Sequence, residues 1–356
     1  MNVRVRLAAA SAALSLIAIA CTGEATDASS VPEEPVTITL LTHDSFDVSK
    51  EVVDTFERSS GITLKIVPAG DAGQLVNRAI LSAGNPEGDV LFGVDDNLFP
   101  KAIEAGVFDT YRPAALDQVG PAIVLDPTDH VVPIDHGEVC LNIDRAWFAD
   151  HRIEPPAGLE DLTSPTYRGL TVVENPATST PGLSFLLATV ARFGDPGFET
   201  FWTQLRANDV RVVDGWEQAY YGGFSGAGGG EGDRPIVVSY ASSPVAEVVF
   251  AEETLDEAPT AVVTDGCYRQ VEFAGVLAGT DHPAEAREVV DFLLSPDFQE
   301  DLPLRMFVYP VVEGTALPEV FERFGATVND PLSMPPEDVA EHRADWVQRW
   351  TDLMLA

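Results

Sequence analysis

The chain has few basic residues for its length. Its 356 residues include 21 Lys and Arg against 57 Asp and Glu, and residues 1–20 hold two of the basic residues and none of the acidic ones. The remaining 19 basic and 57 acidic residues give a net charge of −38. A field of that sign repels nucleic acid and anionic lipid and attracts cations. We therefore expect no nucleic-acid partner, and either a cationic ligand or an acidic surface that serves only solubility.

Cysteine and histidine are also scarce. There are three cysteines, in no CxxC or His-rich spacing typical of zinc. No order of residues typical of a catalytic triad is visible, and Asp95-Asp96 fits a turn after a strand better than a pair of catalytic carboxylates. We therefore expect no metal, no cofactor and no enzymatic activity. The six histidines are scattered at positions 43, 130, 136, 151, 282 and 342.

Long apolar runs are absent after the first 20 residues. Residues 7–20 are almost wholly apolar, follow Arg4 and Arg6, and end directly before Cys21. Such a basic segment, apolar stretch and small residue before a cysteine are typical of a signal peptide, here residues 1–20. We expect an exported chain whose membrane contact is a lipid on Cys21, at the extracytoplasmic face of the cell membrane. Ordinary cleavage that leaves a free Cys21 is the alternative.

The segment that follows is too polar to fold on its own. Residues 21–36 are small, acidic and proline-containing, which suits a flexible tether. Beyond it, Cys140 and Cys267 are left without an assigned role. Outside the cytoplasm such a pair is more often a disulfide than two free thiols, although buried free thiols remain possible.

Strands and helices alternate from residue 37 onward. Strands separated by single helices pair in parallel and form an α/β sandwich. About 320 residues correspond to two lobes at the usual ~100–200 residues per domain. The first set of predicted strands is 37–41, 62–67 and 89–94, with helices at 48–59, 73–82 and 97–105. The second set of predicted strands is 131–143, 169–173, 210–213, 235–240, 261–264 and 268–277, with helices at 182–192, 197–206, 217–221, 285–294, 297–302 and 336–356.

Polar loops follow the first three predicted strands. These loops, 42–46, 69–72 and 95–97, are expected on one edge of the sheet, where ligands bind in open α/β folds. The glycine-rich segment 222–235 lacks the Gly-Lys-Ser/Thr that follows a phosphate-binding loop, so we expect a flexible hairpin-like insertion.

Two further segments carry polar and aromatic groups. Thr180 and Pro181 are typical of the N-cap and the first residue of a helix. The N-terminus of such a helix can also bind a phosphate group. Trp216 follows a predicted strand and Gly215, so it is either a buried anchor or a surface on which a flat cationic ring stacks. Residues 239–244 end another strand with Tyr240 and three serines, a composition that also occurs in simple turns.

Short segments in one fixed order carry a family resemblance. They are THDSF (42–46), LVNRAI (75–80), DVLFGVDDN (89–97), DHG (135–137), TSTPGL (178–183), GWEQAY (215–220), VVSYASSP (237–244), YRQVEF (268–273), SPDFQ (295–299) and VYPV (308–311). In this order they resemble the thiamine-binding solute receptors of bacterial ABC importers, of the periplasmic-binding-protein type II superfamily. The resemblance covers nearly the whole chain after the tether.

The resemblance implies an architecture and a role. The fold is expected to be a two-lobe α/β periplasmic-binding-protein type II fold, each lobe a mixed sheet flanked by helices, with hinge connections. Residues 37–137 plus about 268–315 form lobe 1, residues 138–267 form lobe 2, and the lobe of the C-terminal helices, 316–356, is left open. A monomer of this kind captures thiamine or a thiamine phosphate between its lobes and delivers it to the permease subunits.

The resemblance also implies ligand-binding residues. Trp216 and Tyr240 are expected to face the thiamine rings, Asp71 a charged or amino group, and the serine and threonine hydroxyls the hydroxyl or phosphate end. The matching positions are Asp71, Ser179, Thr180, Trp216, Tyr240, Ala241 (through its backbone), Ser242 and Ser243. His43, Asp44 and Phe307 are further candidates.

This sequence departs from the family pattern at several aromatic positions. His43 stands where the family has tyrosine in TYDSF, Ala246 stands where it has a second aromatic residue, and Phe307 replaces a tryptophan. The family strands that contain Cys140 and Cys267 are the two main crossings between the lobes, so a disulfide there would bridge the hinge.

Other ligands and one other class of protein remain open. A ferric-ion receptor is one alternative, with Tyr220-Tyr221 as metal ligands and His43 and Asp44 nearby. A receptor for a polyamine or another organic cation is the second. An extracytoplasmic enzyme is the alternative from a different class.

Overall fold

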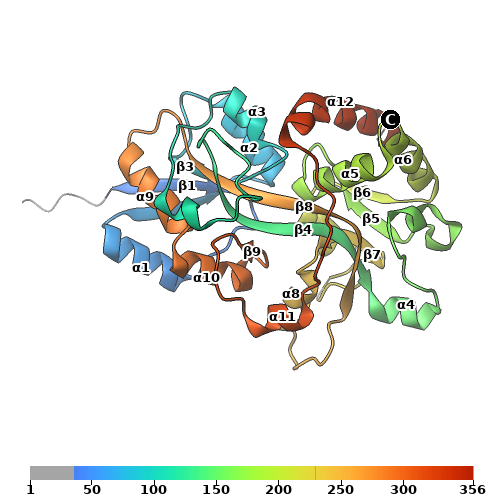
Figure 1. Cartoon of the computed structure of the whole chain (residues 1–356). Helices are drawn as coiled ribbons and strands as arrows, with labels where there is room; N and C mark the ends of the chain where they lie inside the picture. The colour runs from blue at the N-terminus through green and yellow to red at the C-terminus, as the bar shows by residue number, and fades with distance from the viewer. Residues whose placement is uncertain (1–35, 229, 356) are drawn as a thin grey trace, which may run out of the picture. The chain divides into compact units, whose positions relative to one another are not determined.

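The structure is a computed structural model that describes residues 36–228 and 230–355. The predicted signal peptide, Cys21 and all of the tether except Val36 lie outside the described residues. Figure 1 shows strands and helices mixed throughout the fold, with the long strands β4 and β8 side by side across its middle. Within the described part of the chain, no helix is both long and apolar enough to cross a membrane.

The first strands and helices form as the hydrophobic periodicity predicts, with small differences at their ends. Strand β1 pairs in parallel with β2 and β3, which confirms the expected pairing. Helix α1 begins after Ser49, whose side chain accepts a hydrogen bond from Val52 N, and ends at Gly61, which has φ +76°. The elements are β1 (Thr37–Thr42), α1 (Lys50–Ser60), β2 (Thr63–Pro68), α2 (Ala72–Leu81), β3 (Val90–Asp95) and α3 (Phe99–Glu104).

A second group of parallel strands forms the other end of the sheet. Strand β5 pairs in parallel with β6 and β7. The short helices α4 and α8 are not predicted from the sequence. The elements are α4 (Arg145–His151), β5 (Thr171–Glu174), α5 (Thr180–Phe193), α6 (Gly197–Ala207), β6 (Arg211–Val213), α7 (Trp216–Tyr220), β7 (Ile236–Tyr240) and α8 (Ser243–Val249).

Two long antiparallel strands, β4 (Val132–Asp144) and β8 (Thr260–Val276), join these groups. The strand order is β2-β1-β3-β8-β4-β7-β5-β6, so β4 and β8 are central. The sequence predicts two separate strands, 261–264 and 268–277, and this prediction is wrong because β8 is continuous. The residues between the two predicted strands form an irregularity in the ladder, where the register shifts between Val139 and Leu141 of β4.

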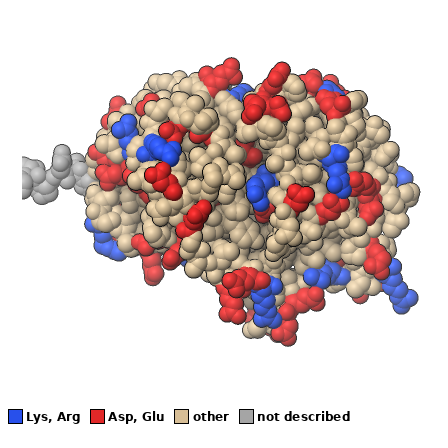
Figure 2. All heavy atoms as spheres, in the orientation of Figure 1, with Lys and Arg blue, Asp and Glu red and all other residues tan. Residues whose placement is uncertain are grey.

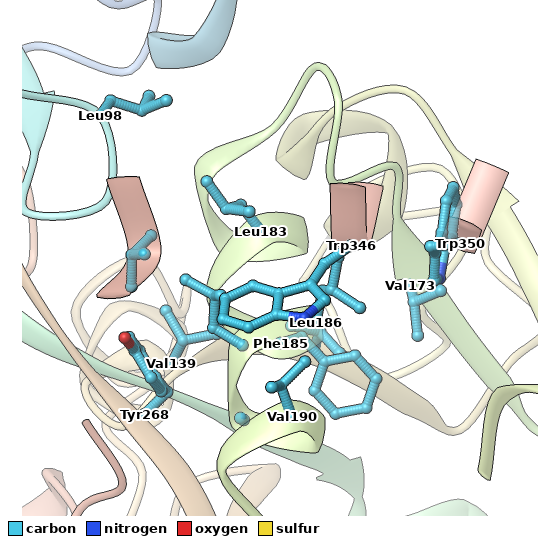
Figure 3. Packing of buried hydrophobic residues seen from close by; sticks show 14 of the residues in the cluster. Leu98, Val139, Val173, Leu183, Phe185, Leu186, Val190, Tyr268, Trp346 and Trp350 are labelled. Carbon is cyan, nitrogen blue, oxygen red and sulfur yellow. The ribbon is translucent and has the colours of Figure 1, made fainter. Parts of the chain in front are cut away.

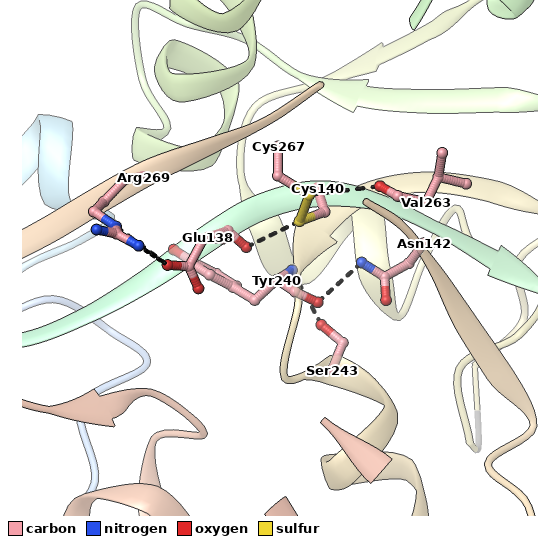
Figure 4. The surroundings of a disulfide bond; sticks show 8 residues. All are labelled: Glu138, Cys140, Asn142, Tyr240, Ser243, Val263, Cys267 and Arg269. Carbon is pink, nitrogen blue, oxygen red and sulfur yellow. Dashed lines mark hydrogen bonds and ion pairs between the residues drawn. A yellow bond between two sulfur atoms is a disulfide. The ribbon is translucent and has the colours of Figure 1, made fainter. Parts of the chain in front are cut away.

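A disulfide joins the two central strands at this irregularity. Cys140 of β4 and Cys267 of β8 are bonded, with their Cα atoms 4.3 Å apart. Figure 4 shows the bond between the strands, near the ion pair of Glu138 with Arg269. Both cysteines are buried beside Ala241, so the predicted pairing is present in the structure.

The C-terminal helices, α11 (Glu319–Phe324) and α12 (Pro336–Met354), pack at different places. Helix α11 contacts α8, whereas α12 lies against α6 and also contacts α3. Figure 3 shows the indole rings of Trp346 and Trp350 among apolar side chains. Trp350 is fully buried, with its ring centroid 5.5 Å from that of Trp202 of α6.

The remaining elements cover the first group of strands. Helices α9 (Pro283–Leu293) and α10 (Pro296–Arg305) follow β8, and the short strand β9 (Tyr309–Pro310) pairs with β4. Phe56 of α1 stacks on Phe292 of α9, with ring centroids 4.4 Å apart. Figure 2 shows acidic side chains spread over the visible face, with basic side chains interspersed among them.

Candidate functional site

A cavity of about 410 Å³ lies where several strands of the sheet end. Its lining includes residues 43–45 after β1, 71 and 72 after β2, 214–218 after β6 and 242–243 after β7. The loop 95–97 is not part of the lining, because Asp96 instead accepts a hydrogen bond from Val271 N within the sheet. Polar loops at strand ends therefore form the cavity, as predicted for two of the three loops.

The indole of Trp216 forms one wall of the cavity. The ring stacks on that of Tyr220, with centroids 5.1 Å apart and an interplanar angle of 18°. Its Nε1 donates a hydrogen bond to Ser239 Oγ at 2.8 Å. Trp216 is half-buried and lines the cavity, so one face packs against the protein while the residue still borders the open space.

The serines after β7 are hydrogen-bonded within the protein. Ser243 Oγ accepts a hydrogen bond from Tyr240 N at 3.1 Å and lies 2.8 Å from Ser239 Oγ. The hydroxyl of Ser242 donates to the carbonyl of Phe307. Tyr240, Ser242 and Ser243 all line the cavity. The two serine hydroxyls thus stabilise the cavity wall. To hydrogen-bond a ligand, each hydroxyl would have to make an additional hydrogen bond or give up one of those it makes within the protein.

Asp71 connects the cavity to the start of α5. It is the residue before α2, lines the cavity, and its Oδ1 accepts a hydrogen bond from Thr180 N at 3.3 Å. Burial raises the pKa of Asp71, and the neighbouring His43 partly offsets that effect. The N-cap of α5 is Ser179, so the predicted N-cap at Thr180 is one residue too late. The Asp71 carboxylate therefore satisfies one of the backbone N–H groups that have no partner within the first turn of the helix.

Three of the predicted ligand contacts lie outside the cavity lining. Ser179 and Thr180 are buried, and their hydroxyl oxygens have no hydrogen-bond partner among the described residues. Ala241 is fully buried, its N–H donates to Glu138 O at 2.9 Å, and its carbonyl accepts from Ala326 N at 3.1 Å. The backbone of Ala241 is therefore engaged by the protein itself.

An ion pair forms another part of the lining. His43 Nε2 lies 3.5 Å from Glu272 Oε2, and both side chains border the cavity. Burial acts to lower the pKa of His43, but nearby carboxylates, of which Glu272 is the strongest, outweigh it and raise that pKa. Sequence reasoning does not single out Glu272. It lies in the segment YRQVEF, which the resemblance includes without implying a ligand contact for Glu272.

Aromatic residues border the cavity near Arg305. Phe307 has φ +56°, a left-handed conformation that is rare for a bulky residue, and it lines the cavity together with Phe250. Their ring centroids are 5.4 Å apart. Ala246, at the position of a family aromatic residue, also lines the cavity. Because Ala246 and Phe250 are four residues apart, Phe250 is positioned to supply a ring that Ala246 lacks.

The glycine-rich segment packs against this region instead of forming a hairpin. Phe224 is fully buried and pairs with Arg234 through a parallel bridge, whereas a hairpin pairs antiparallel. Gly228 N donates to Glu247 Oε2 at 2.7 Å. The segment is therefore not the antiparallel hairpin expected from the sequence.

The tyrosine pair considered as a metal site has protein partners. The hydroxyl of Tyr220 donates to Glu247 Oε1 at 2.8 Å, and burial raises the pKa of Tyr220. Tyr221 is 46% exposed at the cavity. Among the described residues, no three His, Cys, Asp or Glu side chains are grouped so that they could hold a metal ion.

Comparison with known proteins identifies the family. Residues 85–329, more than half of the chain, match the family described as bacterial extracellular solute-binding protein. The chain belongs to this family. Its role is therefore to bind a solute outside the cytoplasm, and the chain is exported.

Individual family members resemble the chain over most of its length. The thiamine-binding periplasmic protein of Escherichia coli is 32% identical over 317 residues, which cover 88% of this chain and 92% of that protein. That of Salmonella typhimurium is 31% identical over 321 residues, with the same coverage. The iron uptake protein A2 of Synechocystis is 25% identical over 74% of this chain and 76% of that protein.

Solved structures of solute-binding proteins share the fold. A periplasmic thiamin binding protein aligns with a TM-score of 0.78 at 28% identity, over 90% of this chain and 96% of that one. Iron-bound HitA from Pseudomonas aeruginosa aligns with a TM-score of 0.72 at 22% identity, over 90% of this chain and 99% of that one. The predicted two-lobe type II fold is thus confirmed for this family member.

Proposed function

We propose that this solute-binding protein captures thiamine in the cavity. The observation that carries the proposal is the combination of an aromatic wall, Trp216 with Tyr240, and the acidic groups Asp71 and Glu272 in one cavity. A flat cationic ring gains from both, because aromatic faces and carboxylates each attract positive charge. The relatives named thiamine-binding periplasmic proteins support the same ligand.

Thiamine phosphates are the second ligand of the proposal. Their negative charge meets Asp44, Asp71 and Glu272 in the lining. The basic side chains there are His43, which is paired with Glu272, and Arg305. Arg305 is already paired with Asp47 at 3.6 Å and with Asp301 at 3.6 Å. We therefore expect unphosphorylated thiamine to bind at least as tightly as its phosphates.

Delivery to an importer completes the proposed role. We infer that lobe 1 (37–137 plus about 268–315) and lobe 2 (138–267) close on the ligand about the central strands. The chain then acts as a monomer, is held at the membrane by a lipid on Cys21, and hands the ligand to the permease subunits. We infer that it binds its ligand without transforming it.

Iron and polyamines are the competing ligands. The similarity to iron uptake protein A2 keeps ferric ion as the alternative. The hydrogen bond from Tyr220 to Glu247 argues against a tyrosine pair turned toward a metal in the cavity. A polyamine suits the acidic lining but makes no use of the aromatic rings of Trp216 and Tyr240.

A thermal-shift panel tests the proposal. The purified protein is heated with thiamine, thiamine monophosphate, thiamine diphosphate, spermidine or Fe³⁺, because a ligand that binds only the folded state raises Tm. We expect thiamine to give the largest increase. An increase with spermidine or Fe³⁺ and none with thiamine would show that the fold is right and the ligand wrong.

A further inference from the structure

The ion pair of His43 with Glu272 is unusual because it lies inside the ligand cavity. Both residues are only 8% exposed, and the charged atoms are 3.5 Å apart. His43 follows β1, whereas Glu272 belongs to the central strand β8. Enclosed charges have lost most of their hydration, so each depends on the partner that replaces water.

Hydrogen bonds orient the Glu272 carboxylate. Gln270 Nε2 donates to Glu272 Oε1 at 3.3 Å. The Oε1 atom of Gln270 in turn accepts a hydrogen bond from the hydroxyl of Tyr240, also at 3.3 Å. One carboxylate oxygen of Glu272 is therefore held by its own strand, and the other, Oε2, faces His43 at the cavity.

A second buried carboxyl group lies beside Glu272. Asp135 is fully buried and lies opposite Glu272 in the β4–β8 ladder. Burial, followed by the Glu272 charge, raises the pKa of Asp135 well above its usual range. Two adjacent carboxyl groups do not both ionise readily. Asp135 thus favours its neutral form beside Glu272.

The remaining charged groups around His43 are all acidic. They are Asp71 at the start of α2 and Asp44 in the loop that also contains His43. Together with Glu272 they raise the pKa of His43, so His43 holds a proton over a wider pH range than a free histidine does. A protonated His43 neutralises the carboxylate that a cationic ligand needs.

We propose that Glu272 recognises the positive charge of the ligand, and that the ligand cation replaces protonated His43 as the partner of Glu272. This inference rests on the proposed function, because it takes the ligand to be a flat cation of the thiamine type. On binding, the N–H bond of His43 facing Glu272 breaks and its proton passes to the solvent buffer. Cation affinity therefore rises with pH, and a neutral molecule of the same shape gains nothing from the exchange.

Proton counting on the unaltered protein is the first test. Thiamine is titrated calorimetrically near pH 6.5, about the usual pKa of histidine, in buffers with different enthalpies of ionisation. We expect a fraction of a proton to be released per thiamine bound, and tighter binding as the pH rises. Thiamine binding without proton release would overturn the exchange but leave the proposed function intact. Absence of thiamine binding would overturn both.

Substitutions assign the exchange to particular residues. Glu272→Gln keeps the shape of the side chain and removes its charge, so thiamine affinity should fall by about tenfold to hundredfold. The affinity for a neutral thiophene analogue of thiamine should hardly change. His43→Gln should abolish proton release, which distinguishes His43 from Asp71 as its source.

A matched variant controls for net charge. Glu313→Gln also removes one acidic group, but Glu313 is exposed and is not part of the cavity lining. It should bind thiamine as the unaltered protein does. If Glu272→Gln weakens thiamine and the neutral analogue equally, Glu272 has only a structural role and the proposal is wrong. If Glu272→Gln does not fold, the proton count on the unaltered protein still decides.

Discussion

At the scale of single residues, matching segments to a family does not by itself tell which of their side chains reach the cavity. Trp216 and Tyr240 belong to recognisable segments, and both line the cavity. Glu272 lies in the segment YRQVEF, but one acidic residue in a strand has no spacing that would mark it as a cavity residue. Its partner His43 lies in a distant segment, and only the fold brings the two together.

Trp216 provides the first prediction at this scale. Trp216→Ala removes the stacked ring and its hydrogen bond to Ser239, so thiamine binding should weaken by about 1–3 kcal/mol. Trp216→Phe keeps a ring and should lose less. Calorimetry of both variants makes the comparison. Equal affinity in the alanine variant and the unaltered protein would make Trp216 a packing residue only.

Ser179 provides a second prediction. Its hydroxyl oxygen is buried and has no hydrogen-bond partner among the described residues. If that hydroxyl meets the ligand when the lobes close, Ser179→Ala should weaken binding by about 0.5–1.5 kcal/mol. The free energy of unfolding without ligand should stay the same or rise, since a buried unsatisfied group is removed. Lower stability with unchanged affinity would contradict this role.

At the scale of helices and strands, periodicity predicts long elements better than short or irregular ones. The strands β1 to β3 are recognisable as short runs rich in apolar residues, and α1 and α2 because their apolar residues fall on one face. Helices α4, α8 and α11 have too few turns to show such a stripe. Strand β8 looks interrupted in sequence, because Asp265-Gly266 resembles a turn, yet pairing with β4 on both sides keeps the strand continuous.

The disulfide is a prediction at this scale. Cys140 and Cys267 are 127 residues apart in sequence. Closing so long a loop stabilises the protein by at most about 4–5 kcal/mol through the unfolded state, less any native strain. The double variant Cys140→Ala with Cys267→Ala should therefore lower the free energy of denaturant unfolding, and reductant should have no further effect on it. Two titratable thiols at these positions in the denatured, unreduced protein would refute the disulfide.

At the scale of the whole molecule, the acidic composition divides into a surface part and a buried part. The chain has a net charge of −36, and acidic side chains are spread over the face shown in Figure 2. Others are enclosed by the sheet: burial raises the pKa of Asp95 and Glu174 well above the usual range, and that of Asp96 to about 7. The net charge follows from the sequence. Which acidic residues are buried does not, because that depends on how the fold encloses the ends of the strands.

Buried acids set the expected pH dependence of stability. A carboxyl group whose pKa is raised in the folded state binds more protons when folded than when unfolded, so its contribution to stability falls as pH rises. The stabilisation that Asp96 contributes is lost as the pH rises from about 3.9, its pKa in the unfolded chain, to about 7, its pKa in the folded protein. Tm should therefore be higher near pH 5 than near pH 8, and Asp96→Asn should flatten the profile. A Tm that rises over this range would contradict the expected sign.

Calorimetric titration of the purified protein with thiamine tests the central claim most directly. The cavity, its aromatic wall and its acidic groups predict one thiamine bound per chain, with a Kd in the micromolar range or tighter. Unphosphorylated thiamine should bind at least as tightly as its diphosphate. Saturable binding of Fe³⁺ or spermidine without any binding of thiamine would contradict the claim.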